Sequence, residues 1–221
     1  MDGTRTYIVG RSRVAVIDPG PRDAKHLNAV ADAVGSGVAA SVVVTHLHPD
    51  HAEGAVELAR MLGTIVRALQ HDDEIETDEG ELRALYTPGH TPDHFSFWWP
   101  HADIVFCGDL MMGGLDTALV AVPEGNLAEY MTSLRAIAQL LPKAIYPAHG
   151  DPFLDPQTAI SRYMRHREER LDQVRSARAK GLTGDDMFVE VYGSDLDPRL
   201  KTYAVEALTA YVDYLNEHEN H

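Results

Sequence analysis

Three histidines and one aspartate fall within six consecutive positions, in an order that suits metal binding: His46, His48, Asp50 and His51. They follow residues 41–45, a mostly β-branched run that predicts a buried strand. The first two histidines are two positions apart, so their side chains can leave the end of that strand on one face and reach one ion. Pro49 ends the strand, and the second pair begins the next helix, which aims that pair at a neighbouring point. The spacing therefore predicts two adjacent metal ions.

The alternative interpretation of this cluster is a chance group of solvated loop histidines. The chain holds 12 histidines among its 221 residues, so this residue type is frequent in it. Three histidines and an aspartate at this spacing nevertheless arise rarely by chance, which favours the metal site.

Segments with strand and helix patterns alternate along the first 155 residues and must position this cluster. Apolar, β-branched runs predict strands at residues 6–9, 13–17, 41–45, 65–66, 82–86, 95–99, 104–107 and 144–146. Apolar residues at helical spacing predict helices at residues 23–34, 52–62 and 127–141. The acidic residues 71–80 are interpreted as a solvated loop. This alternation predicts an α/β fold in which two mixed sheets pack face to face with helices outside, a four-layer arrangement.

Two further histidines and an aspartate stand in loops that follow predicted strands: His90, Asp109 and His149. Loops at strand ends are where functional side chains gather. His94 lies four residues after His90 and could support a site residue by a hydrogen bond, but we interpret it as a packed or hydrogen-bonded loop histidine.

At these positions the sequence resembles the metallo-β-lactamase superfamily. The match consists of the H-x-H-x-D-H motif at residues 46–51, followed in the family's order by Gly-His at 90, Gly-Asp at 109 and Ala-His-Gly around 149. The resemblance implies the αββα metallo-β-lactamase fold. It also implies that one metal would be held by His46, His48 and His90, the other by Asp50, His51 and His149, and that Asp109 would bridge them.

The implied ligand set contains only nitrogen and oxygen donors, which suits Zn²⁺, with Fe or Mn as alternatives. We therefore expect two zinc ions per chain. Zinc lowers the pKa of bound water to about 7, so a metal-bridging hydroxide is available at neutral pH. Asp50 is the candidate catalytic residue, since its carboxylate can orient that hydroxide while binding metal.

The composition suits a soluble chain that buries a full core, because 44% of the residues are hydrophobic and 24% are charged. The first residues show no secretory signal, and no apolar run approaches membrane-spanning length, so we expect a cytoplasmic protein without membrane contact. The single cysteine, Cys107, excludes an internal disulfide, fits a reducing compartment and is expected to be a small buried side chain.

The net charge of −15 argues against nucleic-acid binding over the whole surface. Residues 157–180 differ, because they hold seven basic and three acidic side chains, a local charge of +4. This segment has the pattern of a long amphipathic helix, and two more helices are predicted at residues 184–191 and 198–215. Its arginines either guide a polyanion such as single-stranded RNA, or pair with the acidic catalytic domain and with Glu168, Glu169 and Asp172 and so fasten the C-terminal helices in place.

The C-terminal residues also resemble a subfamily of lactamase-like endoribonucleases. This resemblance rests on residues 166–170, 181–183, 191–192 and 204–215. It implies a catalytic domain at residues 1–155 and a helical, winged-helix-like domain at residues 156–221. The alternative is an all-helical cap with a solvated arginine face.

The sequence thus predicts a metal-dependent hydrolase that acts on a phosphodiester, such as an oligonucleotide, or on a small-molecule ester, thioester or lactone. One alternative is a thioesterase like the hydroxyacylglutathione hydrolases, which have the same ligand set. The other is a non-catalytic binding protein stabilised by its metals. A true β-lactamase fits less well, because those secreted enzymes lack the bridging aspartate.

Overall fold

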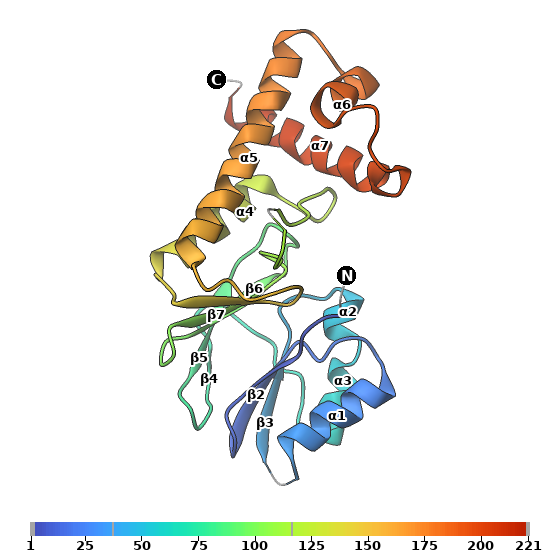
Figure 1. Cartoon of the computed structure of the whole chain (residues 1–221). Coiled ribbons are helices and arrows are strands. Elements are labelled where there is room, and N and C mark those ends of the chain that lie inside the picture. Colours follow the sequence, from blue (N-terminus) through green and yellow to red (C-terminus); the bar gives the residue numbers. More distant parts are fainter. Residues whose placement is uncertain (1–2, 37, 116, 220–221) are drawn as a thin grey trace.

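The computed structural model describes residues 3–36, 38–115 and 117–219, which form a sandwich of two β-sheets with helices on the outer faces (Figure 1). The first sheet contains β1 (Tyr7–Val9), β2 (Arg13–Ile17) and β3 (Ala39–Val43) in that order. β1 and β2 pair antiparallel, and β2 and β3 pair parallel.

The second sheet contains five strands in chain order: β4 (Glu74–Ile75), β5 (Leu82–Tyr86), β6 (Phe95–Trp99), β7 (Ile104–Gly108) and β8 (Ala144–Pro147). Successive strands from β4 to β7 pair antiparallel, and β8 pairs parallel to β7. The parallel pair requires a crossover connection, which a helix of the outer layer provides.

Alternation along the strands divides the core into layers. On β2, Ala15 and Ile17 point toward the second sheet and pack in one cluster with Phe97 and Phe106. Val14 and Val16 point the other way, into a cluster with the outer helices. Because successive side chains of a strand face opposite sides, β2 is buried on both faces.

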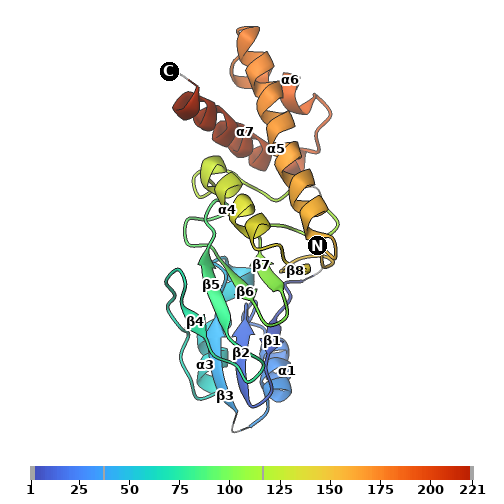
Figure 2. The ribbon, with the colours of Figure 1, turned by 90° about the vertical axis from the view of Figure 1, so that its left-hand side faces the viewer.

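Helices cover both outer faces, as Figures 1 and 2 show. α1 (Ala24–Val34) begins at Asp23, whose side chain accepts a hydrogen bond from the His26 amide, and buries Leu27, Val30 and Val34 against the first sheet. Two short helices, α2 (Pro49–Ala52) and α3 (Ala55–Met61), lie on the same side. α4 (Leu127–Gln139) begins at the cap residue Asn126 and covers the second sheet. The predicted four-layer αββα fold is confirmed.

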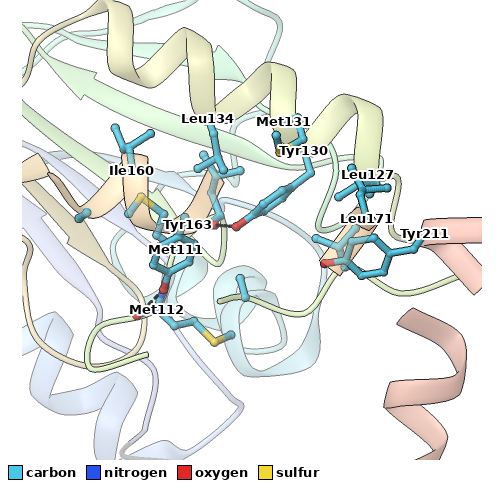
Figure 3. Close-up of a cluster of buried hydrophobic side chains, with 14 of the residues drawn as sticks. Met111, Met112, Leu127, Tyr130, Met131, Leu134, Ile160, Tyr163, Leu171 and Tyr211 are labelled. Atoms are coloured by element: carbon cyan, nitrogen blue, oxygen red, sulfur yellow. Dashed lines mark hydrogen bonds between the residues drawn. The ribbon is translucent and has the colours of Figure 1, made fainter. Parts of the chain in front are cut away.

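The C-terminal residues form α5 (Pro156–Ala179), α6 (Gly184–Tyr192) and α7 (Pro198–His218). The described residues from 156 to 219 contain no strand, so the all-helical alternative fits this segment and a wing is not seen there. Its core is continuous with that of the second sheet: Figure 3 shows Leu171 and Tyr211 near Leu127 of α4, and all belong to one buried cluster. The division between residues 155 and 156 stays a prediction.

Two predicted elements end elsewhere than expected. The strand expected over residues 41–45 ends at Val43, because the Thr45 amide donates its hydrogen bond to the Asp18 carboxylate (2.6 Å) instead of to a neighbouring strand. The strand expected over residues 65–66 is reduced to a single bridge between Val42 and Val66.

The helix expected over residues 52–62 is divided into α2 and α3. At the division, the Gly54 amide donates to the Gly20 carbonyl (2.9 Å), and a Cβ at Gly54 would lie 2.8 Å from the Leu27 side chain. The acidic stretch 71–80, expected to be entirely loop, contains the short strand β4. Cys107 is buried in β7, as predicted. None of the helices in the described ranges has the length and apolar character that crossing a membrane requires.

Tyr163 of α5 fastens the C-terminal helices to the sandwich. Its hydroxyl donates to the Met112 carbonyl (2.6 Å) and accepts from the Met112 amide (2.9 Å), as Figure 3 shows. We predict that Tyr163→Phe lowers the free energy of unfolding by about 1–3 kcal/mol, because two buried backbone groups lose their partner. Urea unfolding measures the change, with Tyr203→Phe on the exposed face of α7 as control. Equal stability of the two variants would contradict this role.

Candidate metal centre

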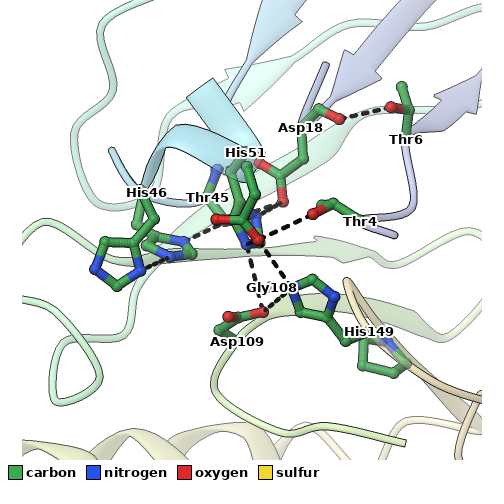
Figure 4. Close-up of polar contacts among 12 residues, drawn as sticks. Thr4, Thr6, Asp18, Thr45, His46, His51, Gly108, Asp109 and His149 are labelled. Carbon is green, nitrogen blue, oxygen red and sulfur yellow. Dashed lines mark hydrogen bonds and ion pairs between the residues drawn. The ribbon is translucent and has the colours of Figure 1, made fainter. Parts of the chain in front are cut away.

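The seven predicted ligands converge where the two sheets meet, although they come from four separate parts of the chain. β3 and the loop after it lead to His46 and His48, and α2 carries Asp50 and His51. The β5–β6 loop carries His90. Asp109 directly follows β7, and His149 lies two residues beyond the end of β8. Figure 4 shows four of these side chains pointing toward one another: His46, His51, Asp109 and His149.

Three imidazoles form the first group of donors. His48 Nδ1 lies 2.9 Å from His46 Nε2 and 3.3 Å from His90 Nε2. All three ligand atoms lie within 4.8 Å of one another.

The second group consists of a carboxylate and two imidazoles. Asp50 Oδ2 lies 3.2 Å from His149 Nε2 and 3.6 Å from His51 Nε2. Asp109 lies between the groups: its Oδ1 is 3.5 Å from both His51 Nε2 and His149 Nε2, and its Oδ2 is 3.8 Å from His90 Nε2. The two oxygens of one carboxylate therefore face different groups, as a bridging ligand requires.

The nitrogens on the outer side of the rings fix how each imidazole is protonated. His51 Nδ1 donates to Asp18 Oδ2 (2.9 Å), and His90 Nδ1 donates to the Leu119 carbonyl (2.9 Å). His48 Nε2 donates to Glu124 Oε2 (3.0 Å). Because the outer nitrogen of each of these three rings donates outward, the inner nitrogen is the one that would bind a metal, in His51 after the loss of its own proton.

Observations in the structure itself fit a bound cation. His51 Nε2 and Asp109 Oδ1 are buried and have no hydrogen-bond partner among the described residues. Unpaired buried polar atoms cost free energy. A cation within reach of these atoms would remove that cost, and the all-nitrogen and oxygen donor set suits Zn²⁺.

The charge state of the site also suits a cation. Burial, together with neighbouring histidines such as His51, lowers the pKa of His46, so this imidazole stays neutral. Burial opposes protonation of His51 too, but the Asp109 and Asp18 carboxylates raise its pKa to about 10. The pKa of Asp109 lies below its usual value, because His51 outweighs the effect of burial. Without a metal, the two neighbouring carboxylates thus favour a positive charge on His51, and a bound cation would supply that charge in place of the proton.

Asp18 is a site residue that sequence reasoning missed. Its buried carboxylate accepts from the Thr45 amide, the Thr45 hydroxyl (2.8 Å) and His51, and Figure 4 shows it behind His51. Its φ of 51° is rare for a residue other than glycine, and the three hydrogen bonds offset that strain. A signal was present, because Asp18 directly follows an apolar strand as other site residues do.

Two more polar side chains support the ligands. Glu124, which the sequence did not single out as part of the site, accepts from His48. His94 is buried and hydrogen-bonded, as expected: its Nε2 accepts from the Asp109 amide (3.3 Å), and its Nδ1 lies 3.0 Å from the Thr87 hydroxyl. Burial lowers the pKa of His94 to about 3, which keeps it neutral in that role.

The arginines of α5 point largely into the C-terminal helices. Arg170 lies over the Tyr192 ring (4.4 Å to its centre) and donates to a backbone carbonyl of α6. Arg175 pairs with Asp172 and Glu219, and Arg178 donates to a side chain of α7. These three arginines therefore join the C-terminal helices to one another. Asp172 is an expected partner, whereas the contacts with α6 and the end of α7 differ from the expected pairing with the acidic catalytic domain.

Comparison with known proteins gives consistent results. The model of the metallo-β-lactamase superfamily matches residues 64–149, which include His90, Asp109 and His149. The chain is 28% identical over 235 residues to the atrochrysone carboxyl ACP thioesterase of Aspergillus fumigatus, with 93% of this chain and 55% of that protein covered. It is 30% identical over 223 residues to lactamase-like protein adaB of Aspergillus niger, with 87% and 69% covered. The chain thus spans only part of the length of these relatives.

Solved structures share the fold. A metallo-β-lactamase family protein from Thermus thermophilus superposes with a TM-score of 0.76 at 16% identity, covering 97% of this chain and 88% of that one. TTHA1623 in a di-iron-bound form superposes with a TM-score of 0.54 at 24% identity, covering 71% and 92%. Taken with the sequence identity to the Aspergillus niger protein, the fold and the family model establish that the chain belongs to the metallo-β-lactamase superfamily of hydrolases.

Proposed function

We propose that the protein is a binuclear metal-dependent hydrolase of acyl compounds, with a thioester as the preferred substrate. The observation that carries this proposal is the convergence of seven candidate ligands, two of which have a buried ligand atom without a hydrogen-bond partner among the described residues. One ion would be held by His46, His48 and His90, the other by Asp50, His51 and His149, with Asp109 shared. Zinc suits these donors, and iron is the alternative because a protein of the same fold holds two irons.

Two divalent ions bound there would act as Lewis acids and lower the pKa of a water molecule to about 7. The chain itself supplies an exposed carboxylate beside them. The Asp50 side chain is 51% exposed, whereas that of Asp109 is buried. Its Oδ2 accepts a hydrogen bond from the Thr4 hydroxyl (3.0 Å), which holds the carboxylate in one orientation. Asp50 is therefore the residue that we assign to orienting water and accepting its proton.

Three observations support an acyl substrate over a phosphodiester. Relatives of this chain include ACP thioesterases. Leu47, between two candidate ligands, is 71% exposed, and Leu119, whose carbonyl contacts His90, is 38% exposed, so apolar side chains lie beside the site. Several arginines of α5, which a polyanion would need, are bound internally.

The chemistry of the leaving group favours a thioester. A thiol has a pKa near 8.5, so it can leave as a thiolate without a proton donor. Amine leaving groups need a general acid, and in the described part of the chain no lysine or tyrosine side chain hydrogen-bonds to the seven candidate ligands. Single-stranded RNA remains the second candidate, because residues 157–180 carry a local charge of +4.

The first test concerns the metals. Protein purified without chelator should contain close to two ions per chain by elemental analysis. Asp109→Ala should lower metal affinity by at least about 10–100-fold and reduce hydrolysis with it, because it removes the shared ligand. Asp32→Ala, an exposed aspartate on α1, is the matched control and should change neither. Full metal content and full rate in Asp109→Ala would show that this residue is not the bridge.

The second test concerns the substrate. Metal-replete protein should hydrolyse an acyl thioester faster than a matched oxygen ester, a lactone, nitrocefin or single-stranded RNA. The rate on the thioester should be insensitive to salt, whereas binding of a single strand would weaken by about 0.7 log units per log unit of salt for each phosphate contacted. Preferential, salt-sensitive cleavage of RNA would replace the thioesterase proposal. Absence of turnover on the whole panel in protein with two ions would favour a binding protein.

A further inference from the structure

The 117–126 loop supports only one of the two donor groups. His90 Nδ1 donates to the Leu119 carbonyl (2.9 Å), and His48 Nε2 donates to Glu124 Oε2 (3.0 Å). Both contacts hold the nitrogen on the far side of the ring from the centre, so they aim the ligand nitrogens of the first group. In the second group, His51 is held by Asp18, which comes from the end of β2.

The C-terminal helices hold this loop in place. Arg167 of α5 is buried and donates through Nη2 to the carbonyl of Ala118, the residue before Leu119. A second connection runs from the Val122 amide to the Glu206 carbonyl of α7 (3.4 Å). The carbonyl that fixes His90 therefore lies one residue from a carbonyl fixed by α5.

The surroundings of Arg167 are unusual for a buried cation. No carboxylate of the described residues pairs with it. Its Nη1 donates to the Tyr211 hydroxyl (2.9 Å), and its guanidinium lies 4.8 Å from the centre of the Tyr130 ring; Figure 3 shows both tyrosines in the core between α4 and the C-terminal helices. An apolar side chain would avoid the cost of burying this charge. Unlike an apolar residue, the arginine provides charge-assisted hydrogen bonds to the Tyr211 hydroxyl and to the Ala118 carbonyl, and the second of these reaches the 117–126 loop.

We propose that Arg167 is a positioning residue for the metal centre: through Ala118 and Leu119 it orients His90, and it thereby sets the affinity of the metal position formed by His46, His48 and His90. The position formed by Asp50, His51 and His149 does not depend on it. This inference rests on the proposed binuclear function. It makes the C-terminal helices part of the metal centre, because one metal position is fully formed only when they are docked.

A purely structural role for Arg167 predicts a different outcome. If the arginine only joined α4, α5 and α7, its loss would lower stability and weaken both metal positions alike, or neither. Loss of an outer hydrogen bond to a ligating histidine typically weakens metal binding by about 10–100-fold, and that loss is confined to the ion concerned. Whether loss of Arg167 weakens one metal position or affects both alike therefore distinguishes the positioning role from the purely structural one.

The experiment measures stepwise zinc dissociation constants in two backgrounds, with a competing chromophoric chelator. His149→Ala leaves only the first position intact, and His48→Ala leaves only the second. In the His149→Ala background, Arg167→Met and Glu124→Ala should each weaken the remaining ion by about 10–100-fold. In the His48→Ala background they should leave it unchanged. Arg170→Met is the matched control, because Arg170 also lies on α5, over a tyrosine ring and against a carbonyl, and contacts α6 instead of the loop.

Equal weakening in both backgrounds, or no weakening in protein that circular dichroism shows to be folded, would overturn the role of Arg167. Arg167→Lys, which keeps the charge and loses the planar fork, is measured in the same way if Arg167→Met fails to fold, and the same two results decide. A different result of the same experiment would overturn the proposed function. A parent protein that binds fewer than two ions overturns the binuclear centre and this inference with it, whereas two ions with an unaffected first position overturn the inference alone.

Discussion

His51 lies between two buried carboxylates, and the rest of the structure depends on this arrangement. Asp18 accepts from its Nδ1, and Asp109 faces its Nε2 at 3.5 Å. Asp18 directly follows β2 of the first sheet and Asp109 directly follows β7 of the second, so the arrangement forms only when the two sheets are packed together. The same Asp18 carboxylate accepts the hydrogen bond of the Thr45 amide, so this amide does not pair with a neighbouring strand. β3 therefore ends before Thr45, and the chain continues into the candidate ligands. The packing of the two sheets and the orientation of a candidate metal ligand therefore depend on the same residue, His51.

The sequence predicted which side chains converge at the candidate centre but not which residues hydrogen-bond to them from outside. Candidate ligands follow apolar strands, and strand ends of one sheet meet at one edge, so their convergence follows from local patterns. Asp18 and Glu124 support His51 and His48 from 33 and 76 residues away in the chain, and no periodicity encodes such a contact. The division of the helix expected over residues 52–62 has the same origin, since Gly54 packs against a residue of α1.

The C-terminal helices show the limits of reading charge from sequence. The excess of arginine in residues 157–180 suggested a surface for polyanions, yet Arg167 is buried and Arg175 pairs with acidic residues of its own helix and of α7's end. Charge counts cannot tell an outward arginine from an inward one, because both fit an amphipathic helix. The described part of this segment contains three helices and no strand, and its core joins that of the second sheet. Hydrogen bonds between this segment and the 117–126 loop connect its packed core to the candidate metal centre.

The central claim is that two metal ions lie side by side in the seven-donor cluster. Anomalous diffraction at the zinc absorption edge, from crystals of protein purified without chelator and supplied with zinc, tests it most directly. We expect two peaks about 3.5–4 Å apart, as in other two-metal sites. One should lie against His46, His48 and His90, the other against Asp50, His51 and His149, with Asp109 between them. A single peak, or peaks away from these residues, would contradict it.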